Sequence, residues 1–264
     1  MAFGFFAIAV VTLAFFLKPC FFDKEINQES KDGASQNEEL DFQGYNSLTD
    51  ADLLKKINKR ETLAIIDIRN ADSFGQEHIA GSKNILPENL ESDLSSLDKD
   101  NPCVIIDNLG LDPMEIQVMK QLREKGFSDV AYLEGGFSQW KNQLNPTITS
   151  GDPYSFTDQS KVTYLKSDEL KNIISQEPNL YLIDLRKSSQ FVSGHLKEAV
   201  NIYLEDLESR YREIPIGKKI ILYDDNGFGA FQGAVRLFDL GVTNVFALSD
   251  GLDVWKQKGF EVAK

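Results

Sequence analysis

The stretch IIDIRNADSFGQEHIAGSKNI, residues 65–85, decides the fold because the chain contains a second version of it, LIDLRKSSQFVSGHLKEAVNI, at residues 182–202. Three polar residues recur in the second copy at a constant spacing of 117 positions. They are Asp67 with Asp184, Arg69 with Arg186, and His78 with His195. A long match that keeps charged residues in register is typical of a duplicated structural unit.

Two further segments extend the repeat. CVIIDNLG (103–110) corresponds to IILYDDNG (220–227) at the same spacing, and VAYLEGGFSQW (130–140) corresponds to VFALSDGLDVW (245–255) at a spacing of 115. The match therefore continues over roughly 100 residues with a slip of two positions. We interpret the chain as a domain duplication.

The repeat sets the predicted domain boundaries. The first domain covers residues 45–148, and the second covers residues 160–264. The linker between them, residues 149–159, is rich in turn-forming residues. The first 44 residues have no counterpart within the repeat.

Each repeat alternates strand patterns with helix patterns. In the first repeat, residues 63–68, 103–107 and 130–133 are short apolar runs, as expected for strands that are buried on both faces. Residues 114–125 carry apolar side chains at helical spacing and are followed by Gly126, a typical helix stop. The predicted fold class is therefore α/β, with a mostly parallel sheet flanked by helices in each domain.

The first 22 residues predict a membrane anchor. Residues 2–17, AFGFFAIAVVTLAFFL, carry no charged side chain, and Phe21 and Phe22 continue the apolar run after Lys18. A helix that extends to Phe22 reaches about 33 Å, enough to span a hydrocarbon core of about 30 Å. We expect a single-pass transmembrane helix, with the side of the membrane that holds the domains left open. A cleaved signal peptide and a lipid attached at Cys20 are the alternatives.

The next segment and the whole chain are acidic. Residues 23–44 hold seven acids against two lysines, which predicts a solvated tether. The net charge of −13 argues against nucleic acid as a partner, because phosphate backbones select basic surfaces. Only two cysteines, Cys20 and Cys103, and two histidines occur, so we expect no disulfide framework, no metal and no cofactor.

The motifs together resemble those of the rhodanese (sulfurtransferase) family. The first copy holds D-x-R at 67–69, H-I-A-G at 78–81 and L-E-G-G-F-x-x-W at 133–140, and the second holds D-x-R at 184–186, G-H-L at 194–196 and D-G with a tryptophan at 250–255. The resemblance covers both repeats, about 210 residues. It implies, for each repeat, a small α/β domain with a central parallel sheet.

Active members of this family carry a cysteine at the end of the strand before the central loop, in the pattern C-x-x-G-x-R. The resemblance implies that its thiolate carries sulfur as a persulfide, beside backbone N–H groups that hold an anion. Aligning on the glycine places Asp107 and Asp224 at the cysteine position, and Asp112 and Gly229 at the arginine position. The altered loops are Asp107, Asn108, Leu109, Gly110, Leu111 and Asp112 in the first copy, and Asp224, Asp225, Asn226, Gly227, Phe228 and Gly229 in the second.

A carboxylate in these loops is incompatible with the family chemistry. It cannot form a persulfide, and its negative charge opposes the binding of thiosulfate or phosphate. We expect Asp107 and Asp224 to accept backbone N–H bonds before a helix, so that each fills an anion-binding position with an internal anion. The alternative is that the acidic loop around Asp224 and Asp225 binds a cation or a basic partner.

The other polar motif residues are predicted to be structural. The resemblance suggests that the two Asp-x-Arg motifs form internal ion pairs at strand ends, and we expect the two histidines to be hydrogen-bonded turn residues. Cys103 lies in a predicted buried strand, where a free cysteine behaves as a small apolar side chain. A role for Cys103 as a sulfur carrier is the alternative.

The sequence therefore favours a membrane-anchored, catalytically inactive tandem rhodanese-like protein. We expect it to act as a protein-binding or scaffolding subunit of a membrane complex, since two acidic domains suit a partner with basic patches. A sulfurtransferase that uses Cys103 is one alternative, although the loops argue against an enzyme. A sensor that binds a small ligand in one altered loop is the other.

Overall fold

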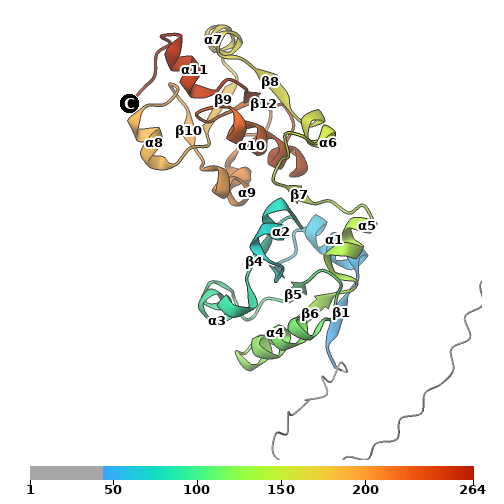
Figure 1. The fold of residues 1–264 in the computed structure, drawn as a ribbon. Coiled ribbons are helices and arrows are strands. Elements are labelled where there is room, and N and C mark those ends of the chain that lie inside the picture. Colours follow the sequence, from blue (N-terminus) through green and yellow to red (C-terminus); the bar gives the residue numbers. More distant parts are fainter. Residues whose placement is uncertain (1–43) are drawn as a thin grey trace, which may run out of the picture. The chain divides into compact units, whose positions relative to one another are not determined.

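The structure is a computed structural model that describes residues 44–264. Within this range each repeat folds as a five-stranded parallel sheet with helices on both faces, which confirms the predicted α/β class (Figure 1). The predicted anchor at residues 1–22 lies outside the described residues, as does the predicted tether except for Gly44. None of the helices in residues 44–264 combines the length and the apolar character needed to cross a membrane.

The first repeat contains the elements expected from its strand and helix patterns. Its strands are β1 (Asn46–Leu48), β2 (Ala64–Asp67), β3 (Glu77–His78), β4 (Ser82–Asn84), β5 (Cys103–Ile106) and β6 (Val130–Leu133). Its helices are α1 (Asp50–Lys59), α2 (Ala71–Gln76), α3 (Leu90–Asp93), α4 (Pro113–Glu124) and α5 (Gly136–Asn142), with 3-10 turns at η1 (Pro87–Asn89) and η2 (Leu94–Ser96). The sheet has the order β1-β6-β5-β2-β4, and every neighbouring pair is parallel.

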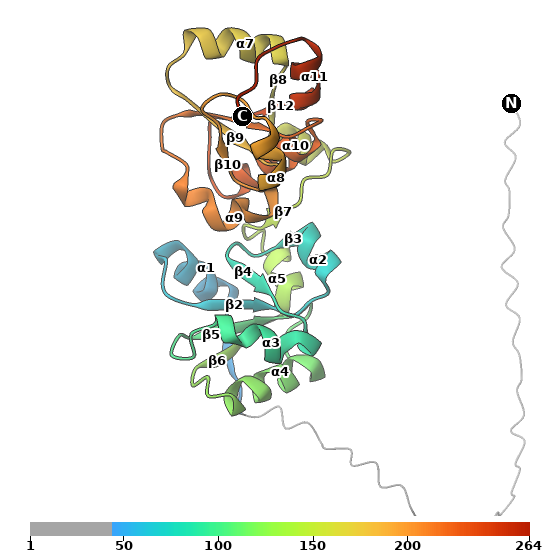
Figure 2. The same cartoon turned by 90° about the vertical axis from the view of Figure 1, so that its left-hand side faces the viewer.

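Helices cover both faces of this sheet. Because successive residues of a strand point to opposite faces, both sets of side chains are buried. Ile66 and Ile105 pack in a cluster with side chains of α3 and α4, whereas Ile65, Val104 and Ile106 pack in a second cluster with side chains of α1 and α5. Figure 2 shows α3 and α4 on one side of this sheet and α1 on the other. Double-sided burial explains why these strands appear as continuous apolar runs in the sequence.

The second repeat has the same architecture. Its strands are β8 (Thr163–Leu165), β9 (Leu180–Asp184), β10 (Val200–Asn201), β11 (Lys219–Tyr223) and β12 (Val245–Leu248). Its helices are α7 (Ser167–Gln176), α8 (Ser188–Ser193), α9 (Leu207–Arg210), α10 (Phe228–Asp239) and α11 (Gly251–Gln257), with 3-10 turns at η3 (Leu204–Asp206) and η4 (Tyr211–Glu213). The order β8-β12-β11-β9-β10 reproduces the order of the first sheet, strand for strand.

The segment predicted as a turn-rich linker, 149–159, is more ordered than expected. It includes the end of β7 (Ile148–Thr149), which pairs antiparallel with β3, and most of α6 (Phe156–Ser160). Ser155 caps α6 by accepting a hydrogen bond from the backbone N–H of Asp158 at 3.3 Å. A serine followed three residues later by an acid is a helix-start signal, which the abundance of turn formers concealed.

Candidate functional site

The loop after β5 is held by its own first side chain. Asp107 is 4% exposed, and its Oδ1 accepts hydrogen bonds from the backbone N–H groups of Leu109 at 3.0 Å and Gly110 at 2.5 Å. Its carbonyl accepts the N–H of Phe137 at 2.8 Å, which ties the loop to α5. At the tip of the loop, the Leu109 side chain is 71% exposed. The loop therefore combines a buried carboxylate with an exposed apolar tip.

A second buried carboxylate, Glu115 in the first turn of α4, holds the same loop. Asp112 caps α4 by accepting the N–H of Glu115 at 2.7 Å, and the fully buried Glu115 accepts the N–H of Leu111 through Oε2. Within the described part of the chain, Glu115 Oε1 and Asp107 Oδ2 are buried and have no hydrogen-bond partner.

Burial raises the pKa of both carboxyl groups. Burial, together with the charge of Asp107, raises the pKa of Glu115 to about 8. Burial also raises the pKa of Asp107, although the N–H of Gly110 opposes this shift. Glu115 is therefore protonated at neutral pH, because desolvation favours the neutral carboxyl form.

The loop after β11 surrounds Asp224 with backbone donors. Oδ1 of Asp224 accepts the N–H groups of Gly227 at 2.8 Å and Ala230 at 3.2 Å, and Oδ2 accepts the N–H of Gly229 at 3.0 Å. These donors belong to the start of α10, where the helix dipole favours a negative charge. The Phe228 side chain beside them is half exposed. These three backbone donors are therefore occupied by a carboxylate of the chain itself.

Asp225 points to a different partner. Its Oδ1 accepts a hydrogen bond from Arg186 Nη1 at 3.0 Å, and its Oδ2 accepts one from Gln190 at 2.7 Å. Arg186 also binds Asp184 through Nε and Nη2, at 3.0 and 2.7 Å. Burial alone would lower the pKa of Arg186, but its hydrogen bonds to Asp184 and Asp225 raise it. Both carboxylate oxygens of Asp225 are thus hydrogen-bonded within the second repeat, although Arg186 shares its one charge between Asp184 and Asp225.

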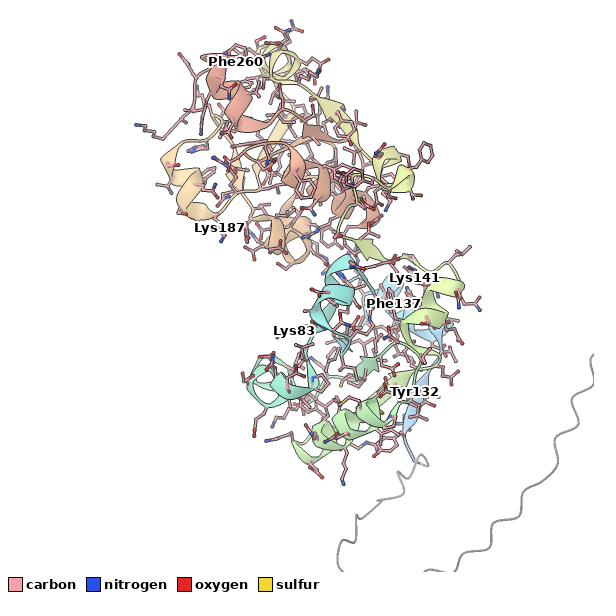
Figure 3. The ribbon with its side chains drawn as sticks, in the orientation of Figure 1. Lys83, Tyr132, Phe137, Lys141, Lys187 and Phe260 are labelled. Atoms are coloured by element: carbon pink, nitrogen blue, oxygen red, sulfur yellow. The ribbon has the colours of Figure 1, made fainter. Side chains whose placement is uncertain are left out.

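The first repeat contains the same Asp–Arg pair. Arg69 binds Asp67 through Nε at 3.0 Å and Nη2 at 2.6 Å, and it donates a further bond to the carbonyl of Glu77 at 2.9 Å. The guanidinium carbon lies 3.6 Å from the ring centre of Phe137, which Figure 3 labels on α5. The pair therefore joins the end of β2 to α5 and to β3, beside the Asp107 loop.

The two histidines occupy equivalent positions, but not the predicted turns, because His78 lies in β3 and His195 forms an isolated β-bridge with Ala263. Nδ1 of His78 lies 2.9 Å from the carbonyl of Phe74, and Nδ1 of His195 lies 3.0 Å from the carbonyl of Phe191. Each imidazole stacks on that phenylalanine, with ring centres 4.1 and 3.9 Å apart. His78 differs in one respect, since its Nε2 lies 2.8 Å from a carboxylate oxygen of Glu208. These contacts hold each histidine against the helix that precedes it, α2 for His78 and α8 for His195.

Cys103 is the one cysteine within residues 44–264. It lies at the start of β5, is 1% exposed and packs in the core cluster with Ile105 and Met119. Burial raises the pKa of the Cys103 thiol to about 12. A thiol that stays protonated is a poor nucleophile, because the thiolate is the reactive form.

Sequence reasoning missed Glu115. The signal was the D-x-x-E spacing from Asp112, which is typical of a helix N-terminal capping box. That pattern predicts a cap, however, and gives no sign that the glutamate is buried.

In the described residues, no group of three or more His, Cys, Asp and Glu side chains has an arrangement that could hold a metal ion.

Comparisons with known proteins agree with this architecture. A family model described as a rhodanese-like domain matches the chain twice, at residues 49–143 and 166–258. Over 87 residues, the chain is 36% identical to the thiosulfate sulfurtransferase GlpE of Shewanella oneidensis, and the alignment covers 33% of this chain and 84% of that protein. It is 30% identical over 104 residues to the uncharacterized protein YibN of Escherichia coli strain K12, covering 38% of this chain and 71% of that protein.

One solved structure matches both repeats in part. A crystal structure of a thiosulfate sulfurtransferase from Pseudomonas aeruginosa matches with 21% identity and a TM-score of 0.47. The match covers 83% of this chain but only 43% of that one, so this chain spans less than half of that protein. The two matches to the family model cover more than half of the present chain. The protein therefore belongs to the rhodanese-like domain family and carries two such domains in tandem.

Proposed function

We propose that this protein is a catalytically inactive tandem rhodanese-like protein that binds a protein partner. The observation that carries the proposal is the bonding of Asp224, whose carboxylate accepts three backbone N–H groups at the start of α10. In the alignment with the family pattern, Asp107 and Asp224 take the place of the sulfur-carrying cysteine. Neither carboxylate can carry sulfur, and each uses the N–H donors that a substrate anion would need.

The similarity to named thiosulfate sulfurtransferases favours a second candidate, sulfur transfer. Such an activity would have to use Cys103 if it depended on a cysteine of residues 44–264. The thiol is buried in the core and its pKa is raised to about 12, so it offers neither access nor a thiolate. The contacts of Cys103 therefore support the proposal that the protein is catalytically inactive.

The test is transfer of sulfur from thiosulfate to cyanide, measured as thiocyanate. We expect no transfer by the wild-type protein or by Cys103→Ser, with the S. oneidensis enzyme assayed in parallel as the positive control. Asp224→Cys is the matched gain-of-function variant, because it places a thiol among the same three N–H donors. Transfer by the wild-type protein that disappears in Cys103→Ser would overturn the proposal.

The partner is proposed from the chemistry of the two loops. Leu109 and Phe228 expose apolar side chains at the loop tips, in a chain with a net charge of −13. Such a surface suits a segment that combines apolar and basic side chains. We further propose that residues 1–22 anchor the protein in a membrane, so that the partner belongs to a membrane complex.

Binding is tested by co-purification of the full-length chain after extraction in mild detergent. A specific partner should be retained by the wild-type protein and lost from the double variant Leu109→Ser/Phe228→Ser. The matched control is Val192→Ser/Ile174→Ser, which removes exposed apolar side chains elsewhere in the second repeat. A wild-type protein that purifies alone would count against the scaffolding role.

A further inference from the structure

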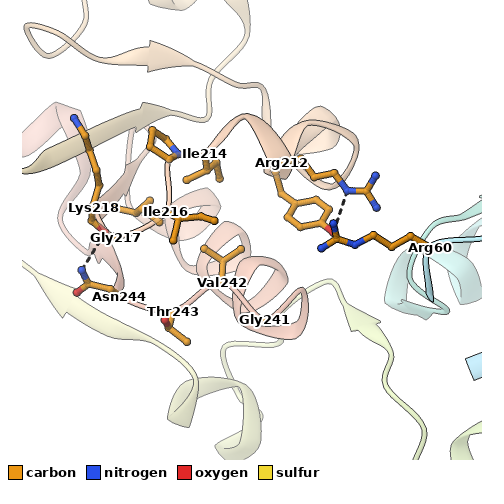
Figure 4. Close-up of a pocket in the computed structure, with 13 residues that line it drawn as sticks. Arg60, Arg212, Ile214, Ile216, Gly217, Lys218, Gly241, Val242, Thr243 and Asn244 are labelled. Atoms are coloured by element: carbon orange, nitrogen blue, oxygen red, sulfur yellow. Dashed lines mark hydrogen bonds between the residues drawn. The ribbon is translucent and has the colours of Figure 1, made fainter. Parts of the chain in front are cut away.

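A cavity lies at the opposite edge of the second sheet from the Asp224 loop. Residues 214–218 lead into β11 and residues 241–244 lead into β12, and they enclose a cavity of about 500 Å³ (Figure 4). Because parallel strands begin at one edge of the sheet and end at the other, this cavity is separate from the loop that follows β11. A volume of this size falls in the range of sites for small molecules, about 300–1,000 Å³.

The lining of the cavity is basic although the chain is acidic. Arg60, Arg212 and Lys218 contribute side chains, whereas none of the 13 lining residues, all within the described range, is an acid. No carboxylate in residues 44–264 forms an ion pair with Arg60 or Arg212. The acids next in sequence are already paired with other residues, Glu61 with Lys56 at 3.0 Å and Glu213 with Arg210 at 2.7 Å. The positive charge of the cavity is therefore not neutralised from within the described chain.

The two arginines gather at one end of the cavity. Figure 4 places the side chains of Arg60 and Arg212 on the same side, while Lys218 lies at the far side. Arg212 Nε donates a hydrogen bond of 3.4 Å to the hydroxyl of Tyr211, and its guanidinium carbon lies 5.6 Å from the centre of that ring. Two guanidinium groups at one end offer several N–H donors to an acidic group.

Apolar side chains form one wall of the cavity, and Thr243 and Asn244 complete the lining near Lys218. Ile214, Ile216 and Val242 line the cavity between the two loops. Ile216 is fully exposed, with an exposure of 103% relative to an isolated residue, although a large aliphatic side chain gains free energy when it is covered. A cationic end next to an aliphatic wall matches a molecule with an acidic head and an apolar body.

We propose that this cavity binds a small amphipathic anion. The acidic head lies between Arg60 and Arg212, and the apolar body covers Ile214, Ile216 and Val242. The cavity is separate from the altered loops. A ligand bound there can therefore act on the second rhodanese-like domain without sulfur chemistry.

The test uses naphthalene-2-sulfonate as the probe and the full-length chain in a zwitterionic detergent. Calorimetric titration should give one binding event, with the detergent alone as the blank. We expect the double variant Arg60→Gln/Arg212→Gln to weaken binding at least tenfold, and Val242→Asp to weaken it similarly. The uncharged analogue 2-naphthalenemethanol should bind at least tenfold more weakly than the sulfonate.

The matched control is Lys187→Gln/Lys197→Gln, which removes two exposed positive charges from the second repeat outside the cavity. This control should bind the probe like the wild-type protein. Equal binding by the arginine variant and the wild-type protein would overturn the proposal, as would equal binding of the uncharged analogue. Melting curves of all variants establish that the exposed substitutions leave the fold intact.

Two competitors identify the source of the anion. Decanoate represents a free carboxylic acid, and dihexanoyl phosphatidylglycerol represents a lipid headgroup. Each is added below its critical micelle concentration. The competitor that displaces the probe at the lower concentration identifies the source of the anion. Failure of both to displace the probe would contradict the proposed ligand class.

Discussion

At the scale of single residues, the pair Asp107 and Glu115 makes the first repeat sensitive to pH. The folded protein holds a proton on Glu115 up to a pKa of about 8, whereas an unfolded glutamate loses it near 4.5. Stability is therefore greatest below pH 4.5 as far as this group is concerned, falls between pH 4.5 and 8, and stays reduced above pH 8.

Glu115→Gln should remove this dependence. The amide oxygen can still accept the N–H of Leu111, and the amide carries no proton that is lost on titration. We expect the free energy of unfolding at pH 9 to rise by at least about 1 kcal/mol, the equivalent of one pKa unit, with little change at pH 5. Urea unfolding at both pH values measures this. The control is Glu124→Gln, an exposed acid of the same helix, and a gain of the same size there would contradict the account.

Removal of the Asp224 carboxylate should also lower the free energy of unfolding. Asp224→Ala leaves the N–H groups of Gly227, Gly229 and Ala230 without their acceptor, so we expect a loss of about 1–3 kcal/mol. Sulfate should then bind the vacated donors and raise the melting temperature of the variant more than that of the wild-type protein. Equal effects of sulfate on the two proteins would show that the donors do not form an anion site.

At the scale of elements, close packing between a loop and a helix start depends on glycine. Gly251 begins α11 with φ = +66°, and a Cβ atom there would lie 2.2 Å from the carbonyl oxygen of Asp225. Gly259 has a similar φ of +72°, but a Cβ atom would meet nothing within 4 Å. We expect Gly259→Ala to cost about 1 kcal/mol through backbone strain alone. Gly251→Ala should cost clearly more, and chemical unfolding of both variants tests the difference.

Lys161 joins α6 to α10. Its Nζ lies 2.9 Å from Asp158 and 2.8 Å from Asp239, and all three side chains are largely buried. Lys161→Met should destabilise the protein by about 2 kcal/mol, because two buried carboxylates lose a charged donor. Lys219→Met, which removes an ion pair that is more exposed, should cost less.

The ion pairs of Lys161 also predict acid sensitivity. Burial would raise the pKa of Asp158, but the N–H of Asp152 and the ammonium group of Lys161 hold it below its usual value of 3.8. A lowered carboxyl pKa stabilises the fold above pH 3.8, and this contribution is lost as the pH falls further. The difference between wild type and Lys161→Met should therefore shrink in acid, which unfolding at pH 3 and pH 7 measures.

At the scale of the whole molecule, the duplicated sequence predicted both sheets. The apolar runs at 63–68, 103–107 and 130–133 correspond to β2, β5 and β6, because strands buried on both faces exclude polar residues. The ordered linker was not predicted, because a single capping serine was outweighed by its turn-forming neighbours. The burial of Glu115 and the cavity beside Arg60 and Arg212 could not be predicted, since both depend on which distant segments the fold brings together.

The proposed anchor makes a prediction at the same scale. The full-length chain should sediment with membranes and resist extraction by high salt, because an apolar segment is held by the hydrophobic effect rather than by charge. A chain that lacks residues 1–22 should remain in the supernatant. Recovery of the full-length chain in the supernatant would exclude the anchor.

The position of Asp224 makes the second domain resistant to dissolved anions. The Asp224 carboxylate lies three to six residues along the chain from its donors, so it behaves as a tethered ligand. Its effective concentration is of millimolar order or higher and does not depend on the composition of the solution. Dialysis cannot remove such a ligand, and inorganic salts at lower concentration compete poorly with it. We therefore expect changes in free sulfate or phosphate to leave this loop unaltered.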